Sequence, residues 1–318
     1  MSFLRVFLPQ HGLMVLTMIT LSGVTGCQTS HANPPFQVGQ IYDVSKQKVI
    51  DFETLLPRLL DAEVIFIGEE HYTPSHLQAA QKVLEALRTH QRRPAIAMEM
   101  FAWDGQPGLN RYLQESDVSI EQLLKESHWK NNWGGEFSDY QPLVSYAKDH
   151  GLELLALNPP RPLVRSVSKQ GLEQALQSPE MQEWGMGPLA TEDPEYKSLI
   201  FDQIVVCHPS VKHVPRRLFE ASIFRDEGMA HVITEYLNRE PSARDTLVSY
   251  TGGGHIQYKI PVPKRVLRKR PGTKTLTIYL IAWDSSKQEE VALELKNGIA
   301  DFLWLTELGP QGVQARCG

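Results

Sequence analysis

The chain has 318 residues, of which 42% are hydrophobic and 22% are charged. These proportions are typical of a globular protein and exclude a disordered one. The formal net charge is −5, which argues against a nucleic-acid-binding protein because such proteins carry a basic face.

The first segment, residues 1–26, has the features of a bacterial lipoprotein signal peptide. It contains one charged residue, Arg5, and the short apolar run 12–24. That run has the length of a signal-peptide core and is shorter than the roughly 20 residues of a transmembrane helix. Small residues then precede Cys27, as they do where lipoprotein signal peptides are cleaved. We therefore expect cleavage before Cys27 and a lipid anchor on this cysteine.

The next segment is expected to connect this anchor to a folded domain. Residues 27–46 are polar and contain two consecutive prolines, so we predict a lipidated tether ahead of a domain that spans 47–318. Gln28, by resemblance to the sorting rule of lipoproteins, favours the outer membrane, facing the periplasm or the cell surface. Cys207 and Cys317 remain after cleavage. They could pair in an oxidising periplasm, and a free thiol at Cys317 fits the sequence equally well.

The rest of the chain alternates between strand and helix patterns. Short apolar runs, which we interpret as strands, occur at 64–67, 95–98, 152–157, 246–250, 276–282 and 302–305. Helical spacing of apolar residues separates them, and such crossovers imply an α/β fold with a mainly parallel central sheet flanked by helices. A long helical stretch, about 162–240, precedes the fourth strand and predicts an inserted helical subdomain.

Polar side chains follow four of these predicted strands. Glu69 and His71 follow the first, Glu99 the second, Arg161 the third and His255 the fourth. Because the carboxyl ends of parallel strands share one edge of a sheet, we expect these residues to line one pocket.

Each feature also has a purely structural interpretation. Glu69 or Glu70 could cap the helix that begins near Ser75, and His71 could be a hydrogen-bonded core histidine. Gly252 to Gly254 could form a plain turn, although glycines before His255 also suit a backbone that approaches a ligand closely.

Five motifs occur in an order that resembles the ChaN family, which comprises haem-binding lipoproteins of the wider Tiki and erythromycin-esterase-like superfamily. The resemblance covers about residues 48–306. The motifs are GEEH at 68–71, AMEMF at 97–101, YQPLVSYAKDHGLELLALNPPR at 140–161, FRDEGMA at 224–230 and TGGGHI at 251–256.

The resemblance implies a protein of haem or iron uptake or storage, with a tyrosine ligand to the iron and a homodimer that brings two haems together. Tyr140 is the first choice for this ligand because it opens the matched helix, and Tyr72 and Tyr112 come next. His71, Arg161 and His255 are expected to complete the haem site. We expect a neighbouring His or Arg to lower the pKa of the ligating phenol.

Two further segments bear on this prediction. Trp129, Trp133, Phe137 and Tyr140 could wall a haem slot or belong to the ordinary core. The basic cluster at 264–270 is interpreted as a solvated loop, and a contact with a membrane surface or haem propionates is the less favoured alternative.

The alternative function is a metal-dependent hydrolase. Glu69, His71, Glu99 and His255 include ligand types that bind zinc or manganese, and a histidine among them could also act as a general base. No Ser or Cys nucleophile motif is present. We favour haem binding without enzymatic activity over this alternative.

Overall fold

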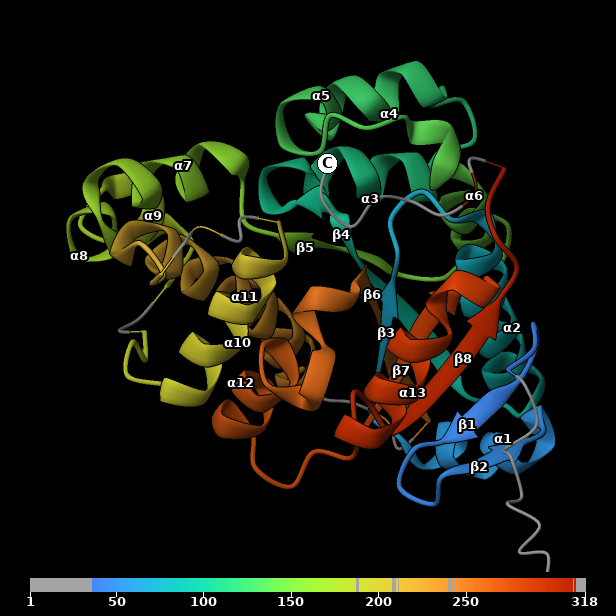
Figure 1. Ribbon diagram of the computed structural model, residues 1–318. Coiled ribbons are helices and arrows are strands. Elements are labelled where there is room, and N and C mark those ends of the chain that lie inside the picture. The colour runs from blue at the N-terminus through green and yellow to red at the C-terminus, as the bar shows by residue number, and fades with distance from the viewer. Residues whose placement is uncertain are drawn as a thin grey trace, which may run out of the picture. The chain divides into compact units, whose positions relative to one another are not determined.

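The computed structural model describes residues 36–310, apart from 187–188, 208–209, 211, 240–241 and 243, and also residue 312 (Figure 1). The predicted signal peptide, Cys27 with its predicted lipid anchor, and Cys317 lie outside the described residues, as does the side chain of Cys207. The lipid anchor and the pairing of these cysteines therefore stay predictions.

An eight-stranded sheet forms the centre of the described chain, in the order β2-β1-β8-β7-β3-β6-β4-β5. Strands β3 to β8 pair in parallel, and β1 runs antiparallel to both β2 and β8. The predicted α/β fold with a mainly parallel sheet is thus confirmed. The strands are β1 Ile41–Asp43, β2 Lys48–Ile50, β3 Val64–Glu69, β4 Arg93–Ala102, β5 Leu154–Asn158, β6 Asp245–Gly252, β7 Thr275–Ala282 and β8 Phe302–Thr306.

Strand β1 lies inside the segment that was predicted as a tether. Ile41 is paired with Trp304 of β8, and Ile41 and Tyr42 are only 2% and 7% exposed. These apolar side chains are buried against the sheet, so residues 41–43 belong to the folded unit rather than to a solvated linker.

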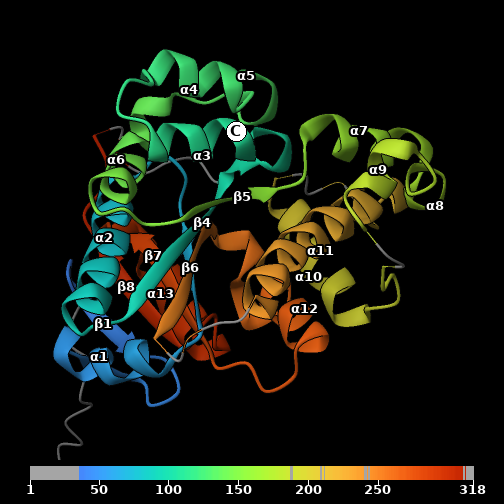
Figure 2. The same cartoon turned by 180° about the vertical axis from the view of Figure 1, so that it is seen from behind.

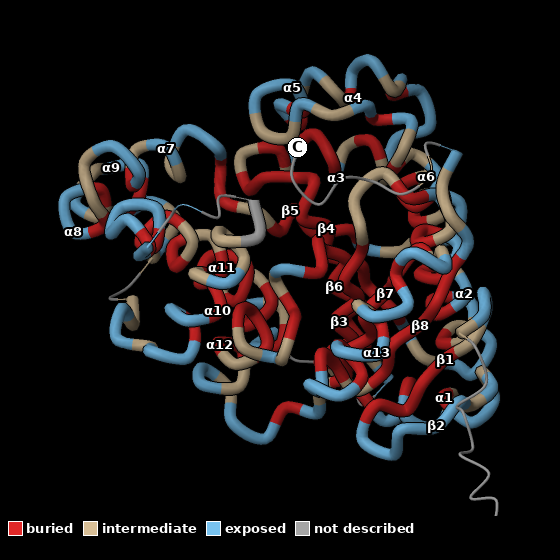
Figure 3. Tube along the Cα trace, viewed as in Figure 1, coloured by how far each residue is buried: buried red, intermediate tan, exposed pale blue. Residues whose placement is uncertain are grey.

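The two faces of the sheet bury alternate side chains of each strand. On β3, Ile65 and Ile67 belong to one buried cluster, whereas Val64 and Phe66 belong to the other. This alternation follows from the two-residue repeat of a strand. Figure 3 shows the buried strands between helices whose outer surfaces are exposed.

Helices cover both faces and extend beyond the β5 edge (Figures 1 and 2). The first buried cluster includes residues of α1 Phe52–Asp61, α2 Pro74–Thr89, α3 Gln106–Gln114, α4 Ile120–Glu126, α5 Trp129–Asn132 and α6 Gln141–Asp149. The second includes residues of α11 Arg216–Asn238, α12 Val262–Lys269 and α13 Gln288–Asn297. Over the described residues, no helix combines the length and the apolar character that crossing a membrane requires.

The chain between β5 and β6 is helical, as predicted. It contains α7 Arg161–Gln170, α8 Leu172–Ala175, α9 Pro179–Glu183, α10 Pro194–Cys207 and α11. Trp103, Val167 and Phe224 pack in one of its buried clusters, and Tyr196 and Ile223 pack in another. These helices extend beyond the edge strand β5 in both ribbon views (Figures 1 and 2).

The basic cluster at 264–270 is largely a helix, so its interpretation as a solvated loop is wrong. It forms most of α12, whose Arg265 is 1% exposed and pairs with Glu227 of α11. The basic composition was misleading because Val262, just before the cluster, and Val266, inside it, are fully buried and anchor this helix to the second core.

Candidate functional site

The carboxyl ends of β3, β4 and β6 bring the predicted residues together. Glu69 ends β3, Gly252 ends β6, and Glu99 lies where the pairing of β4 with β5 is interrupted between Met98 and Ala102. Because β6 lies between β3 and β4, residues contributed by all three strands meet on either side of Gly252.

Glu69 is the buried centre of the first half of the site. Its Oε1 accepts a hydrogen bond from Tyr140 Oη at 2.9 Å and lies 2.7 Å from His71 Nδ1. Its Oε2 accepts a hydrogen bond from Tyr250 Oη at 2.5 Å. The side chain of Glu69 is 0% exposed. Burial raises the pKa of Glu69, and the bonds from His71 and the two phenols partly oppose this rise.

Glu99 is the buried centre of the second half. Its Oε1 accepts a hydrogen bond from Arg225 Nη2 at 2.7 Å and lies 3.2 Å from His255 Nε2. Its Oε2 accepts a hydrogen bond from the backbone N–H of Gly252 at 2.7 Å. Burial opposes ionisation, but the positive charges of His255 and Arg225 dominate and hold the pKa of Glu99 well below its usual range.

Gly252 is the point where the two halves touch. A methyl group on its Cα would lie 2.9 Å from Cε1 and Nε2 of His71 and 3.5 Å from Glu99 Oε2. A side chain at this position would force the ring of His71 to shift, so the glycine lets the imidazole lie against the strand end. The structure places the ring of His71, a side chain of the protein itself, at this close approach, and the approach of a ligand to these glycines stays a prediction.

Both histidines favour the protonated state. Burial would lower the pKa of His71, but the hydrogen bond to Glu69 and the charge of Glu99 outweigh it and raise that pKa. Burial would likewise lower the pKa of His255, whereas Glu99 and Asp226 raise it to about 9. The carboxylates of Glu99 and Asp226 therefore face the positive groups of His255 and Arg225, which lets these buried charges persist.

The structure encloses Tyr140, the tyrosine first predicted to bind iron. Tyr140 is 0% exposed and donates its hydroxyl hydrogen to Glu69. Burial and the charge of Glu69 raise the pKa of Tyr140, and burial also raises the pKa of Tyr72. The expectation of a lowered phenol pKa is therefore wrong for both residues. An iron ion could reach its oxygen only if the surrounding side chains moved.

The other two candidate tyrosines differ from each other. Tyr112 is 7% exposed in the first buried cluster, with Lys148 Nζ 4.0 Å from its ring centre. Tyr72 is only partly buried, follows His71 directly, and has a left-handed backbone with φ of +62°. Its ring lies 6.0 Å from those of His71 and Tyr140.

A partly exposed aromatic wall, formed by His71, Tyr72 and Trp133, borders the edge. The rings of Trp133 and His71 meet edge to face at 5.0 Å, and the buried Nε1 of Trp133 has no hydrogen-bond partner among the described residues. A methyl group on Gly135 would lie 2.6 Å from Tyr72 Oη. Trp129 and Phe137, at 3% and 6% exposure, belong to the core instead.

Arg161 lies at the margin of this wall. It begins α7 and is exposed, and its Nη1 lies 3.8 Å from where a methyl group on Gly134 would stand. Across the described residues, the structure pairs its guanidinium with no carboxylate, so this cation is available to an anionic group at the wall.

The four residues predicted as a zinc or manganese set do not form one. Glu69 faces the phenols of Tyr140 and Tyr250, and Glu99 faces Arg225 and the backbone. Throughout the part of the chain that the structure describes, no group of three or more His, Cys, Asp or Glu side chains is arranged to hold a metal ion. The division into two carboxylate centres is the physical reason.

Sequence reasoning missed two residues that contact this site. Tyr250 bonds Glu69, and Asp226 Oδ1 lies 2.5 Å from His255 Nδ1. Tyr250 stands immediately before the TGGGHI motif and Asp226 lies inside FRDEGMA, so the motifs pointed to their neighbourhood and not to their contacts.

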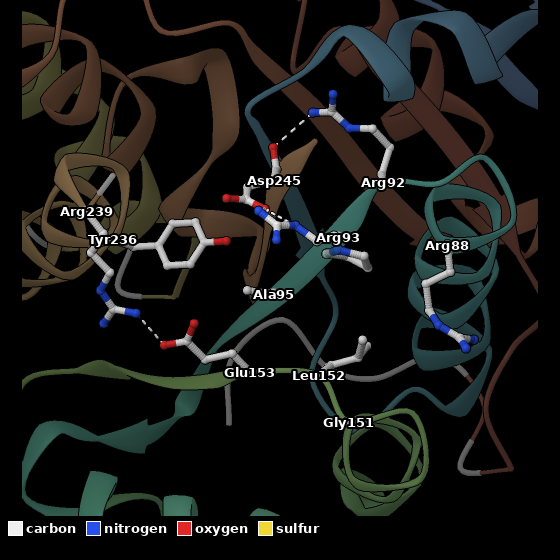
Figure 4. A pocket seen from close by; sticks show the side chains of 11 residues that line it. Arg88, Arg92, Arg93, Ala95, Gly151, Leu152, Glu153, Tyr236, Arg239 and Asp245 are labelled. Atoms are coloured by element: carbon white, nitrogen blue, oxygen red, sulfur yellow. Dashed lines mark hydrogen bonds and ion pairs between the residues drawn. The ribbon is translucent and has the colours of Figure 1, made fainter. Parts of the chain in front are cut away.

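A separate cavity of about 540 Å³ opens at the opposite edge of the sheet, near the amino ends of β4 and β6 (Figure 4). Its arginines are engaged within the chain: Arg93 pairs with Asp245 and Arg239 with Glu153. None of the predicted site residues lines this cavity.

Comparisons with known proteins agree with the predicted resemblance. The family described as "Haem-binding uptake, Tiki superfamily, ChaN" matches residues 55–266. The chain is 26% identical over 283 residues to Protein RETICULATA-RELATED 5, chloroplastic, of Arabidopsis thaliana, an alignment that covers 82% of this chain. The chain spans only about a third of that relative's length, with 36% of it covered.

Solved structures similar to this chain include the following two. ChaN of Campylobacter jejuni, described with cofacial heme binding, has a TM-score of 0.64 and 22% identity, covering 85% of this chain and 98% of that one. The erythromycin esterase EreC, as a mutant in its open conformation, has a TM-score of 0.45 and 16% identity, covering 76% of each chain. The first likeness shows a shared fold.

Proposed function

Because the chain belongs to the ChaN family of haem-binding uptake proteins in the Tiki superfamily, we propose that it is a lipid-anchored protein that binds haem for the uptake or storage of haem or iron. The observation that carries this proposal is the aromatic wall of His71, Tyr72 and Trp133 at the edge where β3, β4 and β6 end.

The residues at this edge fit the chemistry of a haem. A porphyrin needs an apolar surface, and Trp133 with Tyr72 offers one that is partly exposed. The iron needs a donor, and phenol oxygens and imidazole nitrogens are both known ligands of haem iron. When bound, haem supplies an iron centre that can take such a donor. We assign the donor role to Tyr72 ahead of Tyr140, because Tyr140 is enclosed.

The propionates of a haem need cations. Arg161 is exposed beside the wall, and the Arg225 side chain is 33% exposed where it meets Glu99. Guanidinium groups bind carboxylates through paired hydrogen bonds. In this proposal Arg161 takes one propionate, while His255 and Arg225 form the cationic side of the site.

The anchor, the location and the assembly are parts of the same proposal. The apolar run 12–24 followed by Cys27 supports a lipid anchor in the outer membrane. The cofacial heme binding described for ChaN of Campylobacter jejuni supports a homodimer in which two haems face each other.

Hemin titration of the domain that begins at Phe36 tests the proposal. We expect a Soret shift that saturates at a fixed ratio of hemin to protein. Tyr72→Phe should weaken binding at least about tenfold, since it removes the donor, and Tyr140→Phe should retain most of the affinity. The matched control is Tyr236→Phe, because this tyrosine lies at the opposite cavity (Figure 4).

Two outcomes would count against specific parts of the proposal. A wild-type protein without a saturable Soret shift would contradict haem binding itself. Normal binding by Tyr72→Phe together with lost binding by Tyr140→Phe would return the donor role to Tyr140.

A further inference from the structure

His255 is held from behind by a chain of buried groups. Its Nδ1 lies 2.5 Å from Asp226 Oδ1, and Asp226 Oδ2 accepts the hydroxyl hydrogen of Tyr196 at 2.5 Å. Asp226 and Tyr196 are 2% and 0% exposed. Neither residue can reach a ligand at the aromatic wall, so any role in the site must act through His255.

A second layer fixes Tyr196 in turn. The guanidinium carbon of Arg265 lies 4.0 Å from the centre of the Tyr196 ring, and Arg265 Nε lies 3.3 Å from Glu227 Oε1. Arg265 and Glu227 are both 1% exposed. A cation over an aromatic face is attracted to it most strongly where water is excluded. Three elements, α10, α11 and α12, therefore converge behind one imidazole.

The hydrogen-bond chemistry determines which way this imidazole faces. Asp226 is held in its ionised form, because the positive charges of His255 and Arg265 lower its pKa despite burial. An ionised carboxylate only accepts, so Nδ1 must carry a proton. With Nδ1 turned to Asp226, Nε2 is directed to Glu99 Oε1, 3.2 Å away.

We propose that Asp226, supported by Tyr196, is a positioning residue of the haem site that fixes His255 against Glu99. The inference rests on the proposed function. Its consequence concerns Arg225, which shares the Oε1 atom of Glu99 with His255. While His255 neutralises part of the Glu99 charge, Arg225 can turn towards a propionate without leaving a buried carboxylate uncompensated.

The test compares Asp226→Asn, Tyr196→Phe and the control Tyr236→Phe in the domain that begins at Phe36. Proton NMR with nitrogen-15-labelled histidine reports the hydrogen bond directly. The Nδ1–H resonance of His255 should lie far downfield in the wild type and in Tyr236→Phe, and it should move upfield or disappear in Asp226→Asn. Hemin affinity should fall about tenfold in Asp226→Asn and by a smaller factor in Tyr196→Phe.

The two readouts separate this inference from the proposed function. A wild type that binds no hemin contradicts the function, while the NMR signal still tests how His255 is held. A wild type that binds hemin, with Asp226→Asn binding equally tightly, overturns the positioning role whether or not the resonance moves. Should Asp226→Asn fail to fold, Tyr196→Phe keeps the carboxylate, and unchanged hemin affinity and resonance in that variant would overturn the inference.

Discussion

The raised pKa of His255 predicts a specific loss of stability at alkaline pH. Glu99 and Asp226 raise this pKa to about 9 against burial, from an ordinary value of 6.5. A group that binds its proton more tightly in the folded state stabilises that state while it is protonated. The contribution is therefore fully present below about pH 6.5 and is lost as the pH rises through about 9.

The magnitude follows from the two pKa values. The difference between 9 and 6.5 corresponds to about 3 kcal/mol, at about 1.4 kcal/mol for each tenfold change in proton affinity. The side chain of His255 is 17% exposed, so water screens this contribution only in part. The pKa of His71 is also raised, so deprotonation of His71 lowers the stability at alkaline pH as well. The pH dependence of the wild type alone therefore cannot isolate the contribution of His255.

Urea unfolding between about pH 6 and about pH 10, applied to the wild type and to His255→Gln, isolates the effect. The wild type should lose about 3 kcal/mol more than the variant over this range. Equal pH dependence in the two proteins would refute the reasoning, because the imidazolium would then contribute nothing between its two carboxylates.

Three further changes have defined outcomes. Tyr250→Phe removes the 2.5 Å bond to the buried Glu69, and it should lower the free energy of unfolding by about 1.5–3 kcal/mol, measured by urea titration. Gly252→Ala would push a methyl group to 2.9 Å from the His71 ring, and displacement of that ring should weaken hemin binding about tenfold, measured from the Soret band. Cys27→Ala in the full chain should abolish incorporation of labelled palmitate and release the protein from membranes.

Each of these changes has a control and a contrary outcome. A Tyr250→Phe variant as stable as the wild type would contradict a stabilising hydrogen bond to the buried carboxyl group of Glu69. Gly254→Ala is the matched glycine control, since its methyl group would meet only the end of the Gln203 side chain, at 3.3 Å. Equal hemin affinity in both glycine variants would show that His71 takes no part in hemin binding. Continued palmitate labelling of Cys27→Ala would contradict the lipoprotein prediction.

The gathering of the site residues could be predicted from the sequence. Glu69, Glu99 and His255 each follow or end an apolar run of strand type, and helical patterns separate the runs. Parallel strands connected by crossover helices share one carboxyl edge. The expected strand topology alone therefore places these three residues at the same edge of the sheet.

The contacts themselves could not be predicted in the same way. Tyr140 directly precedes helix α6, and the motif that it opens resembles that of the ChaN family, yet its hydroxyl group is hydrogen-bonded to the buried Glu69. Residues 264–270 look solvated by composition, yet Arg265 is enclosed over Tyr196. Exposure depends on which neighbours cover a side chain, and those neighbours are distant in the sequence.

The sequence by itself determined the class of fold, the family and the edge where the chemistry gathers, because strand periodicity and motif order are local properties of the chain. Only the tertiary structure decided that the two carboxylates form separate centres, that Tyr72 rather than Tyr140 borders solvent, and that Asp226 holds His255. Those facts depend on strand order and helix packing across the long segment between β4 and β6, and a linear pattern does not encode such distances.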